Sequence, residues 1–325
     1  MPFQDQLEQM KHNIDAQLKA VLANRRPDCL YEPIRYVIEA GGKRLRPFLV
    51  QLCCQAVGGR EEGSFQAALA VELLHTFTLV HDDIMDHDDL RRGRPTVHKQ
   101  WDEPTAILAG DGLVTLAYQT MLKTSHPALT DVLRVFTDGL LLLCEGQALD
   151  KAFESRDMIS LAEYEDMIEK KTAKLIEVSC EMGAILGNAA SDEQQAIRLF
   201  AHHLGRAFQI QDDLLDLLSD SAILGKPTGS DFIERKKTYL TIHFENHSSS
   251  NQKNELSNIL NTEPLEQTGI DRIRVLLQES GTIEATLAAI RQDVNLALEQ
   301  LNGLPANQAT DHLKLLAKLI ESRVS

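Results

Sequence analysis

Apolar residues recur with a helical period along almost the whole chain, and the alternation typical of β-strands is nearly absent. A spacing of three to four residues between apolar positions places them on one face of an α-helix. Short runs rich in Gly, Pro, Ser or Asn separate the periodic segments. The predicted helices cover residues 3–24, 28–40, 44–57, 64–87, 104–123, 128–151, 160–187, 191–218, 232–246, 252–261, 267–279, 282–301 and 306–322.

The connections between these helices are short, and the two longest cover residues 88–103 and 219–231. No repeat of fixed period and no low-complexity tract interrupts the pattern. The most linker-like stretch, NHSSSNQ at 246–252, has predicted helix on both sides and is therefore a surface loop. We predict a single all-α domain that spans residues 1–325.

Two of the predicted helices, 64–87 and 191–218, lack a wide polar face. The first is apolar all round, and the second becomes so toward its end. A helix of this kind is buried in the centre of a protein. Both nevertheless end in aspartates, in HDDIMDHDD at 81–89 and DDLLD at 212–216. The helix dipole already places partial negative charge at that end, so a cation must offset these carboxylates.

Composition and charge narrow the class of partner. The chain has 325 residues, of which 43% are hydrophobic, and a formal net charge of −15, which disfavours nucleic acid and anionic membrane surfaces. No run reaches the ~18 apolar residues of a membrane span, and the N-terminus lacks the apolar stretch of a signal peptide. We therefore expect a soluble, cytoplasmic protein. The five cysteines show no CxxC spacing and are expected to be reduced thiols in the core.

The spacing of the aspartates predicts their geometry. Positions four apart on a helix lie about 40° apart, so Asp82 and Asp86 share one face, and Asp212 and Asp216 repeat the arrangement. Asp83 lies about a quarter turn away. Hard carboxylate oxygens without a nearby cysteine cluster suit Mg²⁺, which binds one or two carboxylates together with phosphate oxygens. Either motif alone could be a solvated acidic helix end. Two copies on two apolar helices favour a clamp that holds a diphosphate through several magnesium ions.

Six stretches between residues 41 and 240 form an ordered set of motifs. They are GGKRLRP (41–47), ELLHTFTLVHDDIMDHDDLRRGRPTVH (72–98), LAGD (108–111), KKTAKLIE (170–177), GRAFQIQDDLLD (205–216) and GKPTGSDFIERKKTYL (225–240). In this order they resemble the trans-prenyl diphosphate synthases, also called polyprenyl synthetases. Each motif is weak by itself, but six of them in the family's order are specific.

The resemblance implies a fold and a reaction. The fold would be an isoprenoid synthase-like bundle of about ten or more helices around a central apolar cavity. The reaction would be prenyl transfer, in which about three magnesium ions and basic groups stabilise a departing diphosphate so that an allylic C–O bond ionises. The double bond of isopentenyl diphosphate would then attack the cation, and a proton would be lost. No side-chain nucleophile is required, and the chain contains no GxSxG motif.

Carried over to this chain, the resemblance implies metal ligands, two diphosphate subsites and a cation site. The implied metal ligands are Asp82, Asp86, Asp212 and Asp216. The implied ligands of the allylic diphosphate are Arg91, Lys171, Lys226 and Lys236. Those of isopentenyl diphosphate are Lys43, Arg46, His75 and Arg92. The implied catalytic set is Asp82, Asp83, Asp86, Lys171, Thr172, Gln209 and Asp212.

Side-chain chemistry agrees with these roles. Arginine forks match phosphate oxygens bidentately, and lysine acts as a mobile point charge. Lys226 lies in a loop with Gly and Pro, which is typical of a lid. His75 precedes Asp82 by seven residues and so lies on nearly the same helix face. Structural alternatives remain open, namely a solvated basic turn at 43–46, a core histidine at 75, surface lysines at 171 and 236, and ordinary helix residues at 172 and 209.

Product length in this family is expected to depend on residues just before the first aspartate motif. Phe77 lies five residues before Asp82, and a bulky aromatic there, with a plain DDxxD, resembles the geranylgeranyl type. On a helix Thr78 is about 40° from Asp82 and Phe77 about 140°, so Phe77 would shape the cavity wall obliquely. A core phenylalanine is the alternative. We predict geranylgeranyl diphosphate as the product, with farnesyl diphosphate as the next candidate.

Two other activities fit an all-α chain with aspartate motifs. A terpene cyclase would usually carry an N-D-x-x-S-x-x-x-E type second motif and would not need GGKRLRP. A catalytically silent partner subunit would usually have lost aspartates from one motif, whereas both are intact here. The resemblance also implies a homodimer, and the apolar stretch GLLLLC at 139–144 is a candidate for its interface, with the core as the alternative.

Overall fold

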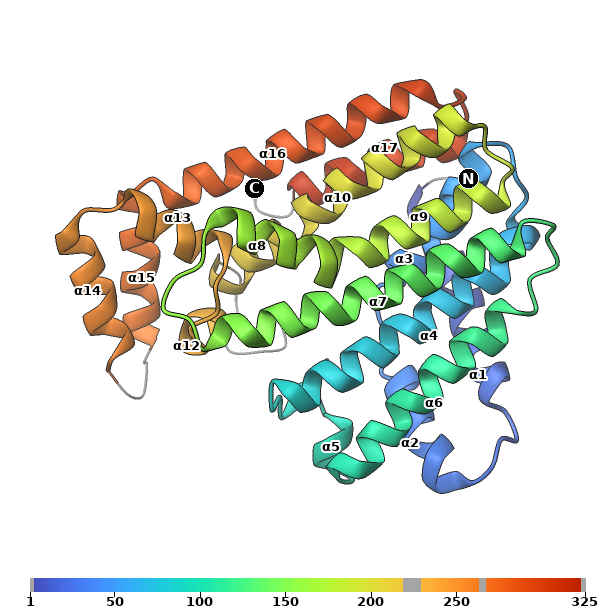
Figure 1. Ribbon diagram of the computed structural model, residues 1–325, viewed down its shortest axis with the longest axis horizontal. Coiled ribbons are helices and arrows are strands. Elements are labelled where there is room, and N and C mark those ends of the chain that lie inside the picture. Colours follow the sequence, from blue (N-terminus) through green and yellow to red (C-terminus); the bar gives the residue numbers. More distant parts are fainter. Residues whose placement is uncertain (1–2, 219–228, 263–266, 323–325) are drawn as a thin grey trace. The chain divides into compact units, whose positions relative to one another are not determined.

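The computed structural model describes residues 3–218, 229–262 and 267–322 and is helical nearly throughout (Figure 1). The prediction of an all-α fold is confirmed. The elements of the first half are α1 (Phe3–Leu22), α2 (Asp28–Glu39), α3 (Leu45–Ala56), α4 (Glu61–Met85), β1 (Leu90–Arg91), β2 (Arg94–Pro95), α5 (Val97–Gln100), α6 (Glu103–Met121) and α7 (Leu129–Glu154). Those that follow are α8 (Leu161–Ile168), the π-helix η1 (Glu169–Ala173), α9 (Lys174–Leu186), α10 (Ser191–Leu218), α12 (Ser230–Ile233), α13 (Tyr239–His247), α14 (Ser250–Leu260), α15 (Gln267–Glu279), α16 (Thr282–Gln300), the 3₁₀-helix η2 (Leu301–Gly303) and α17 (Gln308–Ser322).

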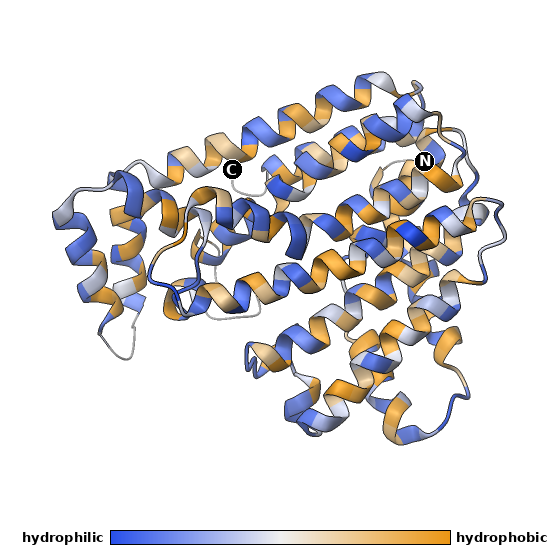
Figure 2. Cartoon of the chain, viewed as in Figure 1, coloured by the Kyte–Doolittle hydropathy of each residue, from blue (hydrophilic) through white to orange (hydrophobic). Residues whose placement is uncertain are grey.

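The chain forms two compact units, each of which is described by itself. Unit 1 contains residues 1–138, 175–198 and 301–313, and unit 2 contains 139–174, 199–300 and 314–325. Helices α7, α9, α10 and α17 have residues in both units. Most helices carry alternating bands of hydrophilic and hydrophobic residues, as amphipathic helices do (Figure 2). A single domain over residues 1–325 stays a prediction.

Unit 1 is built around α4, which packs against α1, α2, α3, α5 and α6. This explains why α4 has no wide polar face, because neighbours surround it. Of the described helices, α4 alone has the length and apolar composition of a membrane span. However, 61% of its apolar window is buried inside the protein, as expected for the core helix of a soluble fold.

A tight hairpin follows α4 in unit 1. Strands β1 and β2 are antiparallel with Arg91 opposite Arg94, which leaves Arg92 and Gly93 as the two turn residues. Both have positive φ, 54° and 73°, as a type I′ hairpin turn requires. The turn therefore places the consecutive arginines of LRRGRP on a rigid ribbon next to the aspartates of α4. The strand pairing was not anticipated, because two-residue strands are too short to show alternation.

Unit 2 combines α8, η1 and the end of α10 with α12 to α16. Here the predicted helix 232–246 is wrong in its first half. The chain forms only the short α12 and then breaks at Arg235, which has a φ of 56°. Thr238 starts α13 with a capping box, because its hydroxyl accepts from Thr241 N and the Thr241 hydroxyl accepts from Thr238 N.

The cysteine prediction is correct for three residues and wrong for two. All five cysteines are free thiols. Cys53, Cys54 and Cys180 are buried, whereas Cys29 and Cys144 are exposed. The two exposed thiols lie on amphipathic helices, where periodicity alone does not decide whether a small residue faces the core.

Candidate active site

The first aspartate motif ends α4 in unit 1. Asp83 is 2% exposed, while Asp82 and Asp86 are half-buried. Arg91 of the hairpin donates from Nε to Asp83 Oδ1 and lies 3.2 Å from Asp88 Oδ2 through Nη2. Burial raises the pKa of Asp83 to about 6, against the opposing effect of Arg91. Negative charge at this helix end is therefore unfavourable unless cations lie nearby, as the sequence predicts.

All four residues predicted for isopentenyl diphosphate lie in unit 1. Arg46 Nη1 is 3.2 Å from His75 Nε2. Gly42 lies under the Arg92 guanidinium, since a Cβ on Gly42 would be 2.8 Å from Arg92 Nη2. Lys43 follows Gly42 in the same loop. Burial, followed by the charges of Arg46 and Arg92, lowers the pKa of His75 well below its ordinary value. The ring is thus neutral inside a basic cluster that suits an anion.

The alternative of a solvated basic turn at 43–46 is wrong for Arg44, whereas Lys43 is exposed. Its side chain is 2% exposed and forms ion pairs with Glu72 Oε1 at 2.5 Å and Asp15 Oδ1 at 2.8 Å. Its Nη2 also donates to Ile38 O at 3.1 Å. Arg44 therefore anchors the GGKRLRP loop to α1, α2 and α4, and the loop presents its neighbours Lys43 and Arg46.

The residues predicted to set product length lie four and five positions before Asp82 on α4, a little more than one helical turn away. Phe77 is half-buried, and its ring meets His81 edge to face with centroids 4.7 Å apart. Thr78 Oγ1 donates to His75 O at 2.8 Å. The His81 ring in turn covers Gly110 of α6, where a Cβ would be 2.1 Å from His81 Nε2. The glycine of the LAGD motif thus permits the close approach of α4 and α6 that fixes this aromatic pair.

The second aspartate motif ends α10 in unit 2. Asp212 is exposed, whereas Asp213 is buried. Tyr164 Oη donates to Asp213 Oδ2 at 2.6 Å, and Gln209 Nε2 donates to Asp213 Oδ1 at 2.7 Å. Burial and the charge of Asp231 raise the pKa of Asp213 to about 8, although both hydrogen bonds oppose the rise. Gln209, predicted to line the cation site, uses its amide nitrogen to orient this aspartate.

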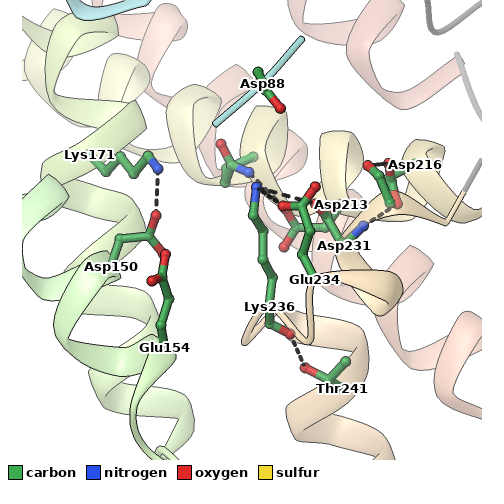
Figure 3. Close-up of polar contacts among 12 residues, drawn as sticks. Asp88, Asp150, Glu154, Lys171, Asp213, Asp216, Asp231, Glu234, Lys236 and Thr241 are labelled. Atoms are coloured by element: carbon green, nitrogen blue, oxygen red, sulfur yellow. Dashed lines mark hydrogen bonds and ion pairs between the residues drawn. The ribbon is translucent and has the colours of Figure 1, made fainter. Parts of the chain in front are cut away.

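Asp216, predicted as a metal ligand, already contacts residues 229–231 at the start of α12. Its carboxylate accepts from Ser230 Oγ at 2.7 Å and from Asp231 N at 3.1 Å (Figure 3). Its carbonyl accepts from Gly229 N at 2.8 Å. An ionised carboxylate has about four lone-pair positions, so these contacts leave room for a metal ion. Asp216 thus fixes the start of α12 whether or not it also binds metal.

Two of the three lysines predicted for the allylic subsite, Lys171 and Lys236, form ion pairs with carboxylates in unit 2. Lys171 Nζ donates to Asp150 Oδ2 at 2.5 Å. Lys236 Nζ lies 2.9 Å from Glu234 Oε2 and 3.9 Å from Asp231 Oδ1 (Figure 3). Both side chains are about a quarter exposed, at 24% and 27%, so neither is an ordinary surface lysine. The third predicted lysine, Lys226, lies outside the described residues.

Three residues of this site were missed by sequence reasoning, namely Asp150, Tyr164 and Asp231. Asp231 carries a usable signal, because it lies in the motif GKPTGSDFIERKKTYL. Asp150 and Tyr164 carry none, since their partners are 21 and 49 residues away in sequence. Thr172 lies beside Lys171 in the π-helix η1, a rare turn that frequently marks functional sites.

The donor set fits magnesium bound together with a diphosphate. Within residues 3–218, 229–262 and 267–322, no group of three or more His, Cys, Asp or Glu side chains could hold a metal ion by itself. Magnesium usually takes only one or two carboxylates and completes its shell with phosphate oxygens and water. The i,i+4 aspartates of α4 and α10 supply such pairs of hard oxygen ligands.

The helical fold, the two aspartate-rich helix ends and the basic clusters beside them are those of the helical prenyltransferases. The chain belongs to the polyprenyl synthetase family, whose family model matches residues 27–277. A short chain isoprenyl diphosphate synthase of Methanothermobacter thermautotrophicus is 37% identical over 99% of both chains. A geranylfarnesyl diphosphate synthase of Natronomonas pharaonis is 37% identical over 92% of this chain and 91% of its own. A crystal structure of geranylgeranyl pyrophosphate synthetase from Pyrococcus horikoshii superimposes with a TM-score of 0.92, at 36% identity over 99% of both chains.

Proposed function

We propose that the protein is a magnesium-dependent short-chain trans-prenyl diphosphate synthase that makes geranylgeranyl diphosphate. It would condense isopentenyl diphosphate with an allylic diphosphate. The observation that carries the proposal is the presence of both D-D-x-x-D helix ends, each next to basic side chains, in a chain of the polyprenyl synthetase family. The product names of the relatives, short-chain, geranylgeranyl and geranylfarnesyl, support a short product.

The allylic diphosphate would be held by aspartates and cations in named roles. Asp82, Asp86, Asp212 and Asp216 would hold about three magnesium ions. When bound, magnesium neutralises the charge that develops on the departing diphosphate. Lys171 would exchange its contact with Asp150 for a diphosphate oxygen. In that contact a mobile ammonium follows the leaving group more readily than a rigid fork does. Arg91, Lys226 and Lys236 complete the implied subsite.

Isopentenyl diphosphate would bind the basic cluster formed by Lys43, Arg46, His75 and Arg92. The neutral His75 ring can donate one hydrogen bond to a phosphate oxygen without adding charge. Arginine forks at 46 and 92 fix the orientation of the diphosphate, and therefore the direction of its double bond. Thr172 and Gln209 would direct oxygen dipoles toward the allylic cation.

The polarity of the surface supports a homodimer as the working assembly. In the stretch 139–144 the side chain of Leu143 is buried, whereas Leu141 is 61% exposed and Cys144 is exposed. The exposed face of this stretch therefore offers apolar surface to a second copy. The acidic net charge of −15 fits a cytoplasmic enzyme with small-molecule substrates.

Product analysis with purified protein tests the proposal. Isopentenyl diphosphate is supplied with dimethylallyl, geranyl or farnesyl diphosphate and Mg²⁺, and products are separated by chromatography after dephosphorylation. Elongation to a geranylgeranyl product that stops on addition of EDTA is the expected result. Farnesyl diphosphate as the final product would select the farnesyl alternative. A hydrocarbon product would indicate a terpene cyclase, and no turnover with any primer would indicate a silent subunit; either outcome refutes the proposal.

A further inference from the structure

The π-helix η1 carries Lys171 and Thr172 on a turn that local sequence does not favour. A π-turn has wider hydrogen-bonded rings than the α-helix and persists mainly where surrounding structure holds it. Here η1 lies between α8 and α9, which are both ordinary α-helices. The direction in which the Lys171 ammonium points therefore depends on what holds η1 in this geometry.

Two glycines hold the backbone of η1 from neighbouring helices of unit 2. A Cβ on Gly146 of α7 would lie 2.3 Å from Lys171 N. A Cβ on Gly205 of α10 would lie 2.6 Å from the Cβ of Ala173. The π-turn is thus in direct contact with α7 and α10, and Lys171 extends from it to Asp150 of α7 (Figure 3).

Arg206, the residue after Gly205, fastens the other side of the turn through three carboxylates. Nη2 lies 2.8 Å from Glu165 Oε1, Nη1 lies 2.9 Å from Glu169 Oε1, and Nε lies 3.3 Å from Asp293 Oδ2. Its side chain is 17% exposed. Glu169 is the first residue of η1, and Glu165 lies one turn earlier on α8. A single guanidinium therefore spans the junction at which the α-helix widens into the π-turn.

We call Arg206 and its three carboxylate partners, Glu165, Glu169 and Asp293, the Arg206 clamp. Asp293 of α16 is itself held by a further contact, which makes this clamp rigid. His203 Nδ1 lies 2.8 Å from Asp293 Oδ1, and the Asp293 side chain is 9% exposed. The planar fork of arginine matches carboxylates in fixed directions, whereas an ammonium would not fix three partners at once. One side chain of α10 thus ties Glu169, at the start of η1, to α8 and α16.

We propose that Arg206 is a positioning residue for the allylic diphosphate subsite, because it holds η1 in the register that presents Lys171 and Thr172. This inference rests on the proposed function, in which Lys171 binds the allylic diphosphate. A displacement of about 1 Å in a positioned group can cost roughly 100-fold in rate, so the loss of the clamp affects binding and turnover of the allylic substrate. The isopentenyl subsite belongs to unit 1 and shares no residue with the clamp.

Steady-state kinetics of Arg206→Gln separate positioning from a contribution to stability alone. We expect the KM for the allylic diphosphate to rise roughly tenfold while the KM for isopentenyl diphosphate changes less than about twofold. In Arg206→Lys we expect a smaller rise in the KM for the allylic diphosphate than in Arg206→Gln. The KM does not return to its original value, because a lysine ammonium cannot bridge Glu165 and Glu169 as the arginine guanidinium does. The matched control is Arg198→Gln on α10, which pairs with the single carboxylate of Glu181 at 3.5 Å and whose side chain is 48% exposed. Its constants should equal those of the unmodified protein.

Calorimetry provides a readout that does not require turnover. Magnesium-dependent binding of inorganic pyrophosphate should weaken roughly tenfold in Arg206→Gln and stay unchanged in Arg198→Gln. If Arg206→Gln does not fold, pyrophosphate binding is measured in Glu169→Gln, which removes only one of the three ion pairs of Arg206. A variant with a lower melting temperature but unchanged constants would overturn the proposal, and so would equal changes in both KM values.

The same measurements distinguish this inference from the proposed function. If the unmodified protein binds magnesium pyrophosphate but elongates no primer, the proposed function fails. The effect of Arg206→Gln on pyrophosphate binding then still shows whether Arg206 positions the diphosphate subsite. If the unmodified protein binds no pyrophosphate, both are overturned.

Discussion

The buried ion pair between Arg44 and Glu72 makes a quantitative prediction about the GGKRLRP loop. The Arg44 side chain is 2% exposed and that of Glu72 is 3% exposed, at a separation of 2.5 Å. In Arg44→Met the Glu72 carboxylate stays buried without its counter-ion. Removing one partner of such a pair costs about 3–5 kcal/mol, a large share of the 5–15 kcal/mol that stabilises a typical protein. The melting temperature should therefore fall by on the order of 10 °C.

A double variant tests whether the cost comes from the orphaned charge. Arg44→Met/Glu72→Leu removes both buried charges, so it should regain most of the lost stability. Asp15 also loses its partner, but its side chain is 32% exposed and can be hydrated. The surface control is Arg134→Met, which removes an ion pair with Asp131 between side chains 63% and 57% exposed. This control should cost less than ~1 kcal/mol.

Calorimetric melting and urea unfolding give the stability of the unmodified protein, Arg44→Met, the double variant and Arg134→Met under the same conditions. The reasoning is refuted if Arg44→Met is no less stable than Arg134→Met, or if the double variant is as unstable as Arg44→Met. Because Arg44 anchors the loop that carries Lys43 and Arg46, the KM for isopentenyl diphosphate should also rise in Arg44→Met, with the allylic KM unchanged.

Three further predictions concern α4 and the loop beside it. Phe77→Ala should lengthen the prenyl products seen by radiolabel chromatography, and an unchanged product spectrum would remove Phe77 from the cavity wall. Gly42→Ala should raise the KM for isopentenyl diphosphate roughly tenfold, because the new Cβ meets the Arg92 guanidinium at 2.8 Å; Gly41→Ala, whose Cβ meets nothing within 4 Å, controls for backbone strain. The folded protein keeps His75 neutral, so below pH 6.5 the unfolded chain binds a proton that the folded chain does not, and stability falls as pH falls. His75→Asn should flatten this decline in urea midpoint between about pH 7 and 5.5, and an unchanged slope would assign it to other groups.

Some features of the site could be predicted from sequence because they depend on local spacing. The helical period of apolar residues predicted nearly all of the longer helices, and the all-round apolarity of 64–87 predicted that α4 is central. The sequence also predicted that Asp82 and Asp86 lie at the end of that helix, where Asp82 is in the last turn and Asp86 is the C-cap residue. Helix ends were less well predicted, and the helix 232–246 was wrong because Arg235 interrupts it with a positive φ.

Other features depend on contacts between residues far apart in the chain, and only the tertiary structure decides them. Arg44 resembles a surface cation in sequence, yet it is buried because Glu72, 28 positions later, neutralises it. The sequence does not distinguish the aspartates of the second motif, but in the structure Tyr164, 49 positions earlier, donates a hydrogen bond to Asp213. The physical reason is that hydrophobic periodicity is a property of neighbouring residues. Whether a charge is hydrated, paired or orphaned is instead determined by which distant side chains the fold brings to it.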